Sequence, residues 1–160
     1  MATSPLEQFV RGAITLREVS GIDGPRMQKM AQTAYRWFQE GRFQDARMAF
    51  EGLIALEPRG AYFWSALAGI DLAEGDLAFA KDRATYAISL NDKELGAYVN
   101  RGEALMRTGR LPEAVRDFKR VAELDPKGKD PMSQRARLLA QSLFDALKAA
   151  QAKSKRPAKP

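Results

Sequence analysis

Residues 41–58 read GRFQDARMAFEGLIALEP, and their layout returns twice more along the chain at a spacing of 34 residues. A glycine opens each copy, an alanine follows five residues later, and a leucine stands near the end. Recurrence at several positions with one period predicts three copies of a single structural unit. The repeating positions are Gly41, Gly75 and Gly109; Ala46, Ala80 and Ala114; Leu56, Leu90 and Leu124; and Pro58, Asp92 and Pro126.

Each copy is expected to form two helices joined by a tight turn. In the first copy, one helix is predicted over about residues 27–40, because Gly41 can end it in the left-handed conformation. A second helix is predicted over about residues 43–56, and Pro58 ends it. The other copies span about residues 61–92 and 95–126. Ala46 is small because the two helices of a unit must pass close to each other there.

These features resemble the tetratricopeptide repeat family over residues 27–128. The family pattern has a small residue in the first helix, here Ala34, Ala68 and Gly102, and an aromatic residue in the second, here Phe50 and Phe118. The resemblance implies an all-α solenoid of three helical hairpins. Ala84 replaces the aromatic residue in the second unit, and Asp71 stands where the other units have Trp37 and Leu105. We therefore expect looser packing in that unit and a partly exposed Asp71, with contact to a partner as the alternative.

The flanking segments are expected to cover the ends of the repeat array, whose apolar faces would otherwise be bare. Residues 1–26 are predicted to hold one helix and a linker; Ser4-Pro5-Leu6-Glu7 is typical of a helix start. An apolar stripe follows, made of Leu6, Phe9, Val10, Ala13, Ile14 and Leu16, and residues 21–25 break the chain before the first repeat. Residues 129–152 are predicted to form a capping helix that starts at Asp130-Pro131. Residues 153–160 are expected to be a disordered basic tail.

Composition narrows the possible functions. The 160 residues include no Cys and no His, so the commonest general base and metal ligand are absent. With no phosphate-binding glycine loop either, we expect no enzyme activity, no cofactor and no metal. The net charge of +6 comes from residues 127–160, which carry +7, so nucleic-acid binding is unlikely beyond non-specific contacts of the tail. No apolar run spans a membrane and no signal peptide is recognised, which favours the cytoplasm.

The resemblance also implies where a partner would bind. In the family, inward-facing residues of each first helix contact the ligand. Here that surface is apolar and aromatic, and it lacks the several basic residues that would hold an acidic C-terminus. An extended apolar peptide is the better match. The corresponding residues are Tyr35 and Phe38; Tyr62, Ser65, Gly69 and Leu72; and Val99, Glu103 and Met106.

A closer resemblance rests on residues 9–16, on residues 34–46 and on Tyr62-Phe63-Trp64. Together with the order of the segments, they are similar to the class II (translocator) chaperones of bacterial type III secretion. The resemblance implies a cytosolic protein that keeps a hydrophobic secreted translocator soluble by holding an extended segment of it. It also implies a homodimer through the N-terminal helix, with Leu6, Phe9, Val10 and Ile14 at the interface. The alternative is a general tetratricopeptide adaptor or scaffold in a bacterial multiprotein complex.

Overall fold

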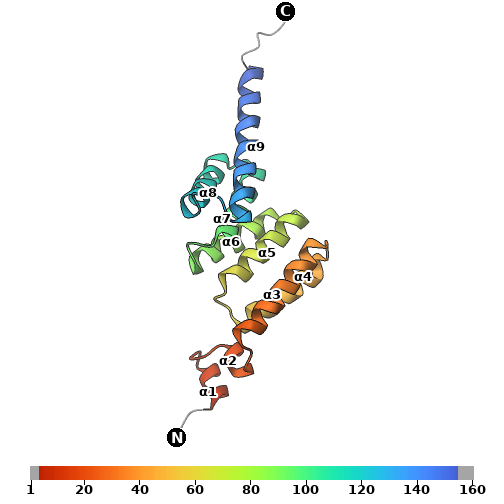
Figure 1. Cartoon of the computed structure of the whole chain (residues 1–160), viewed down its shortest axis with the longest axis vertical. Coiled ribbons are helices and arrows are strands. Elements are labelled where there is room, and N and C mark those ends of the chain that lie inside the picture. The colour runs from red at the N-terminus through yellow and green to blue at the C-terminus, as the bar shows by residue number, and fades with distance from the viewer. Residues whose placement is uncertain (1–3, 155–160) are drawn as a thin grey trace, which may run out of the picture.

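The computed structural model describes residues 4–154, and within them all regular secondary structure is α-helical (Figure 1). This confirms the predicted all-α fold of helical hairpins. The helices are α1 Pro5–Val10, α2 Leu16–Ser20, α3 Gly24–Gln39, α4 Phe43–Leu56, α5 Ala61–Glu74, α6 Leu77–Leu90, α7 Leu95–Arg107, α8 Leu111–Leu124 and α9 Pro131–Ser154. Of the predicted tail, residues 155–160 lie outside the described residues.

The three predicted repeats are the hairpins α3–α4, α5–α6 and α7–α8. Their turns use the predicted glycines: Gly41, Gly75 and Gly109 have φ of 75°, 85° and 79°. The next residue in each turn donates its N–H back to the helix, as Asp76 does to the carbonyl of Asp71 at 2.8 Å. These left-handed glycines end each first helix and reverse the chain. The first helices also contact one another, α3 with α5 and α5 with α7, so they form one continuous inner face.

Small residues set the close approach of the paired helices. Ala46, Ala80 and Ala114 are each 0% exposed. A Cβ on Gly102 would lie 2.6 Å from Cε1 of Phe118, so only glycine fits at that crossing. The expectation of looser packing in the second hairpin is wrong, because α5 and α6 make the most extensive contact of any helix pair. Ala84, which replaces the aromatic residue, is 0% exposed and allows this close approach.

Asp71 is not partly exposed, which corrects the sequence-based expectation. Its side chain is 2% exposed and lies between Arg47 of α4, at 2.8 Å, and Arg83 of α6, at 2.6 Å. Arg47 also pairs with Glu74 at the end of α5. A buried carboxylate needs such partners, and here they come from both neighbouring helices. Asp71 therefore connects the first and second hairpins and has no surface free for a partner.

The N-terminal segment differs from the predicted single helix. Ser4 caps α1 with a full capping box to Glu7, as expected, but α1 ends at Val10 and Gly12 turns the chain with φ of 71°. Thr15 then caps α2 with a second capping box. The predicted apolar stripe is therefore divided between α1 and α2, and Ile14 lies in the segment that connects them. The predicted linker is also shorter, since α3 begins at Gly24 with Asp23 as its cap.

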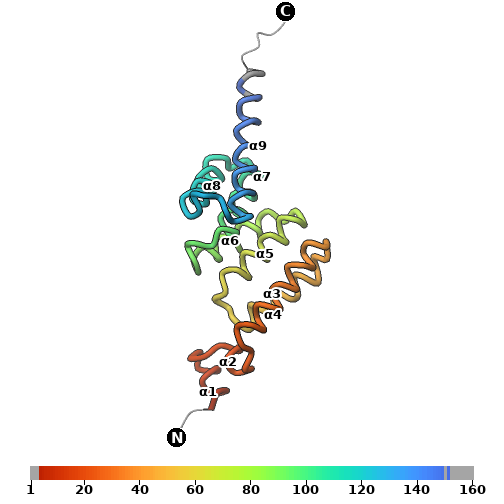
Figure 2. The backbone as a smooth tube through the Cα atoms, in the orientation of Figure 1, coloured from red at the N-terminus to blue at the C-terminus, as the bar shows by residue number. Residues whose placement is uncertain are grey.

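The last helix, α9, packs its first half against α7 and α8 and then runs on beyond the repeats (Figure 1). The backbone trace shows α1 and α9 at opposite ends of the molecule (Figure 2). Leu143 on α9 is buried, whereas Leu138 and Phe144 are 73% and 60% exposed. The helix therefore covers the third hairpin on one side only.

Candidate functional site

A pocket of about 220 Å³ opens on the inner face, between α3, α5, α7 and the start of α9. Five of the nine predicted groove residues line it: Tyr35, Phe38, Tyr62, Ser65 and Gly69. The structure thus brings residues from the first two repeats into one site. The remaining lining residues are Phe50, Ala66, Glu94, Gly96, Asn100, Asp130, Pro131, Met132 and Arg135.

Aromatic rings form one wall of this pocket. The ring centroids of Tyr35 and Phe38 lie 6.1 Å apart, and Tyr62 meets Phe50 edge-on at the same distance. Phe50 is buried in the core, while Tyr35 and Tyr62 are each 44% exposed. Phe50 supports Tyr62 and Phe38 supports Tyr35, and both tyrosines remain partly exposed. A partner that covered them would remove a large apolar area from water at little cost in side-chain entropy.

The opposite end of the pocket is polar. Burial raises the pKa of the Glu94 carboxyl, and the nearby Asp130 raises it further against a lowering hydrogen bond from the Gly96 backbone. Burial also raises the pKa of the Tyr62 hydroxyl, with additions from Tyr35 and Glu94. Partial burial in one pocket therefore raises the pKa values of both Glu94 and Tyr62.

Asn100 supplies a buried amide beside these groups. Its Nδ2 donates to the carbonyl of Ser65 at 2.9 Å, which fixes the orientation of the carboxamide. Its Oδ1 has no hydrogen-bond partner among the described residues, although the side chain is 3% exposed. A buried polar atom without a partner is uncommon in a folded protein, and one beside a pocket points to a ligand or a water.

The other four predicted groove residues lie elsewhere. Leu72 is 3% exposed and Val99 is 0% exposed, each in a core cluster, so neither offers a surface to a partner. Glu103 is paired with Arg135, and Met106 lies beside Leu143 of α9. For the three residues on α7 the cause is α9, which packs along α7 and covers the inner face of the third repeat, whereas Leu72 is buried against α6 and α7. The open part of the groove is therefore formed mainly by the first two repeats.

Sequence reasoning missed the contribution of α9. The sequence predicts a helix start at Asp130-Pro131. It does not predict that this pair lines the pocket, because that depends on where α9 packs. Glu94 was also missed, because it precedes α7 and belongs to no repeating position.

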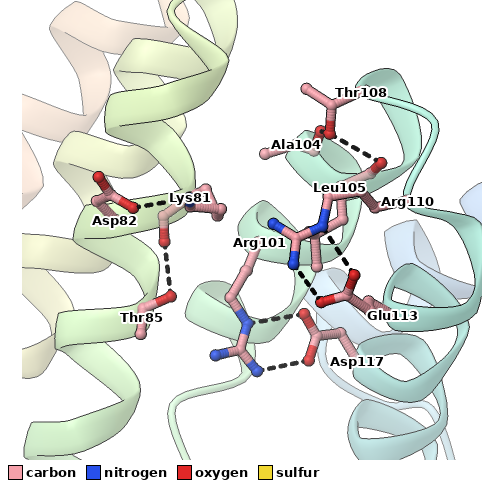
Figure 3. A network of polar contacts seen from close by, with 10 residues as sticks. All are labelled: Lys81, Asp82, Thr85, Arg101, Ala104, Leu105, Thr108, Arg110, Glu113 and Asp117. Atoms are coloured by element: carbon pink, nitrogen blue, oxygen red, sulfur yellow. Dashed lines mark hydrogen bonds and ion pairs between the residues drawn. The ribbon is translucent and has the colours of Figure 1, made fainter.

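A second, charged cleft of about 510 Å³ lies on the outer side, between α6 and the third hairpin. Arg101 donates two hydrogen bonds to the carboxylate of Asp117, at 2.8 and 2.7 Å (Figure 3). Arg110 donates two hydrogen bonds to the carboxylate of Glu113 in the same way. Lys81 and Asp82 pair on the facing helix at 3.1 Å. Because six of the seven charged residues that line this cleft already pair with one another, Arg116 excepted, the inner pocket is the stronger candidate for a binding site.

Neither a metal centre nor a membrane span emerges from the described part of the chain. Residues 4–154 contain no group of three or more acidic side chains placed to hold a metal ion. None of the helices in the same range is long and apolar enough to cross a membrane.

Residues 96–127, which include α7 and α8, match the tetratricopeptide repeat family. The low calcium response locus protein H of Yersinia pestis is 25% identical over 109 residues, which are 68% of this chain. The match spans 65% of that relative's own length. The third hairpin is thus a tetratricopeptide repeat by sequence as well as by structure.

Solved structures share the fold at lower identity. The Yersinia enterocolitica type III secretion chaperone SycD, in complex with a peptide of the translocator YopD, has a TM-score of 0.66 at 22% identity. The match covers 81% of this chain and 98% of SycD, which has also been solved as an alternative dimer. The first tetratricopeptide domain of Spaghetti (RPAP3), bound to the HSP90 peptide SRMEEVD, has the same TM-score at 22% identity, with 79% and 97% covered. Both are protein-binding repeat domains with a bound peptide.

Proposed function

We propose that this protein is a non-enzymatic, cytoplasmic chaperone that holds an extended apolar segment of a secreted, translocator-type client in the groove of α3, α5 and α9. The observation that carries the proposal is the pair of half-exposed tyrosines on the inner face, Tyr35 packed against Phe38 and Tyr62 packed against buried Phe50. The sequence match to protein H and the shared fold with SycD in its YopD complex support the choice of client class.

The dimensions of the groove favour a chain segment over a small molecule. A pocket of about 220 Å³ is smaller than the roughly 300–1,000 Å³ of ordinary small-molecule sites. It fits one or two side chains of a peptide whose backbone runs along the inner face. The aromatic rings of the wall then act as anchors. In protein interfaces a few such residues carry most of the binding energy.

The N-terminal helices supply a surface for a second copy. Leu6 and Val10 on α1 are 63% and 77% exposed, and Phe9 beside them is 37% exposed. Apolar side chains gathered in this way mark interaction surfaces. We propose that α1 joins two protomers, with Leu6, Phe9, Val10 and Ile14 at or beside the contact.

The alternative function is a general adaptor, favoured by the equal structural similarity to the RPAP3 domain that binds an HSP90 peptide. Such a ligand is acidic. In this pocket Arg135 is the only basic residue in the lining, and Glu103 neutralises it. The charge of the pocket therefore favours the chaperone over an adaptor for acidic tails.

The test is client retention by the intact protein and by a Tyr35→Ala/Phe38→Ala/Tyr62→Ala variant, with Met48→Ala as a control at an exposed position on α4. Partners captured from the source organism are identified by mass spectrometry and then co-expressed with each variant. A partner with long apolar segments should stay soluble with the intact protein and with Met48→Ala, and aggregate with the triple variant. Equal solubility with all three proteins would refute the groove as the client site.

A further inference from the structure

Two carboxylates in the groove have no cationic partner among the described residues. Glu94 and Asp130 both line the pocket, and neither is in an ion pair there. The two fully buried acids are treated differently: Asp71 has two arginines, and Asp117 has Arg101. Burial raises the pKa of Glu94, and a partly dehydrated carboxylate without a cation is unfavourable, so the missing cation beside Glu94 calls for an explanation.

A third acceptor belongs to the same pocket. Oδ1 of Asn100 lacks a donor, and its orientation cannot be reversed without losing the bond from Nδ2 to Ser65. This side chain is 3% exposed and lies against Gly69, another lining residue. Two carboxylates without a cation and one amide oxygen without a donor thus line the same pocket, where a ligand that brings donors could bind all three.

The aromatic wall suits the same ligand. Tyr35 and Tyr62 line the same pocket as the carboxylates, and Glu94 helps to raise the pKa of the Tyr62 hydroxyl. The faces of aromatic rings attract cations, with a further gain when the site is dehydrated. A pocket with tyrosine faces on one side and carboxylates on the other resembles in its chemistry the sites that hold ammonium or guanidinium groups.

We propose that the groove holds a Lys or Arg side chain of the bound segment, placed between Glu94 and Asp130, beside the apolar residues that contact the tyrosines. This inference rests on the proposed function and adds to it a charge requirement on the client. It makes the recognised segment apolar and basic together.

The remaining groups around the pocket are compatible with this assignment. Arg135 is the one cation in the lining, and Glu103 pairs with it, so these four charged residues sum to −2. Asp130 also accepts the N–H of Met132 at 2.7 Å and thereby satisfies the start of α9. Gly96 allows Ser65 and the Glu94 carboxylate to lie close to the backbone of α7, because a Cβ there would lie 2.7 Å from Oγ of Ser65 and 3.3 Å from Oε1 of Glu94.

The test uses four pools of acetylated, amidated, fluorescein-labelled nonapeptides. The central residue is Lys, Arg, norleucine or Glu, and the flanking positions are an equal mixture of Pro, Leu, Val and Tyr. Binding to the full chain is followed by fluorescence anisotropy. We expect the Lys and Arg pools to bind about tenfold more tightly than norleucine, as one charge-assisted contact allows, and the Glu pool to bind most weakly.

Glu94→Gln/Asp130→Asn should reduce this preference to less than about twofold. Asparagine can still cap α9. The control is Glu51→Gln/Asp23→Asn, which changes an exposed glutamate and the capping aspartate of α3 and should keep the preference. Equal binding of Lys and norleucine, no binding of any pool, or a preference that survives Glu94→Gln/Asp130→Asn would overturn the inference. If the client is still retained through Tyr35, Phe38 and Tyr62 in that case, the proposed function stands and only the charge requirement fails.

Discussion

Arg83 donates from one guanidinium nitrogen to both carboxylate oxygens of Asp71, at 2.6 and 2.8 Å. Arg47 approaches Oδ1 of the same carboxylate from the other side, at 2.8 Å. One buried acid thus links α4, α5 and α6 at the junction of two hairpins. The ionic contact therefore joins the hairpin that presents Tyr35 to the hairpin that presents Tyr62.

Replacing Asp71 with alanine should lower the free energy of unfolding by about 3 kcal/mol, because it leaves Arg83 largely buried without its anion and leaves Arg47 with Glu74 alone. Urea unfolding followed by circular dichroism measures the change. Glu123→Ala removes an exposed ion pair with Arg120 and should cost less than about 1 kcal/mol. A loss for Asp71→Ala no larger than that of Glu123→Ala would show that the buried network contributes little.

Two helical glycines should respond in opposite directions to alanine. A Cβ on Gly102 would lie 2.6 Å from the ring of Phe118, so Gly102→Ala forces the hairpin apart and should cost about 1–3 kcal/mol. A Cβ on Gly52, in the exposed middle of α4, meets nothing within 4 Å. Gly52→Ala should therefore stabilise the protein by up to about 1 kcal/mol. Thermal unfolding midpoints of the two variants test this, and a shift in the same direction for both would contradict it.

The hairpins could be predicted from sequence because their signals are local. Gly41 needs a positive φ and ends its helix whatever surrounds it, and Ala46 is small because its own partner helix is next along the chain. The partners of Asp71 could not be predicted in this way. Arg47 and Arg83 lie 24 and 12 residues from it, and nothing in an arginine-rich sequence distinguishes them. The sequence alone therefore shows Asp71 only as a polar residue where the other repeats have Trp37 and Leu105.

The groove was predictable only in part, for the same reason. Tyr35 and Tyr62 follow from the register of the repeats, since inner helices stack in order. Val99 follows the same register, but α9 and the third hairpin bury it completely. The position of α9 on α7 depends on long-range packing of a helix that belongs to no repeat, and it brings in Asp130 and Arg135 as pocket residues.

A charge on α1 should prevent self-association. Leu6→Asp/Val10→Asp puts two carboxylates on side chains that are 63% and 77% exposed, so the monomer should fold normally and the dimer should dissociate. Light scattering after size-exclusion chromatography, over a range of concentrations, measures the mass. Met48→Asp, at a 64% exposed position on α4, should leave the wild-type mass unchanged. A monomeric wild type, or a dimer that persists in Leu6→Asp/Val10→Asp, would rule out α1 as the interface.

Glu94→Gln should stabilise the protein at neutral pH. Burial raises the folded-state pKa of this carboxyl, so the folded protein binds a proton more readily than the unfolded chain does. The stability of the wild type therefore falls as the pH rises from the ordinary value of 4.5 through the raised folded-state pKa. Glutamine does not titrate and can still accept the N–H of Gly96. The gain should thus be present at pH 7 and vanish below about pH 4.5.

Urea unfolding of Glu94→Gln and of the wild type at pH 4 and pH 7 measures this difference, with Glu51→Gln on the surface of α4 as the matched control. A variant less stable than the wild type at pH 7 would mean that Glu94 has a stabilising partner in the free protein. If instead the variant is more stable and binds the Lys-containing peptides less tightly, the carboxylate reduces stability in the free protein and contributes to binding. This combination is what a residue kept for recognition should show, because its cost in the empty groove is offset when the client supplies the cation.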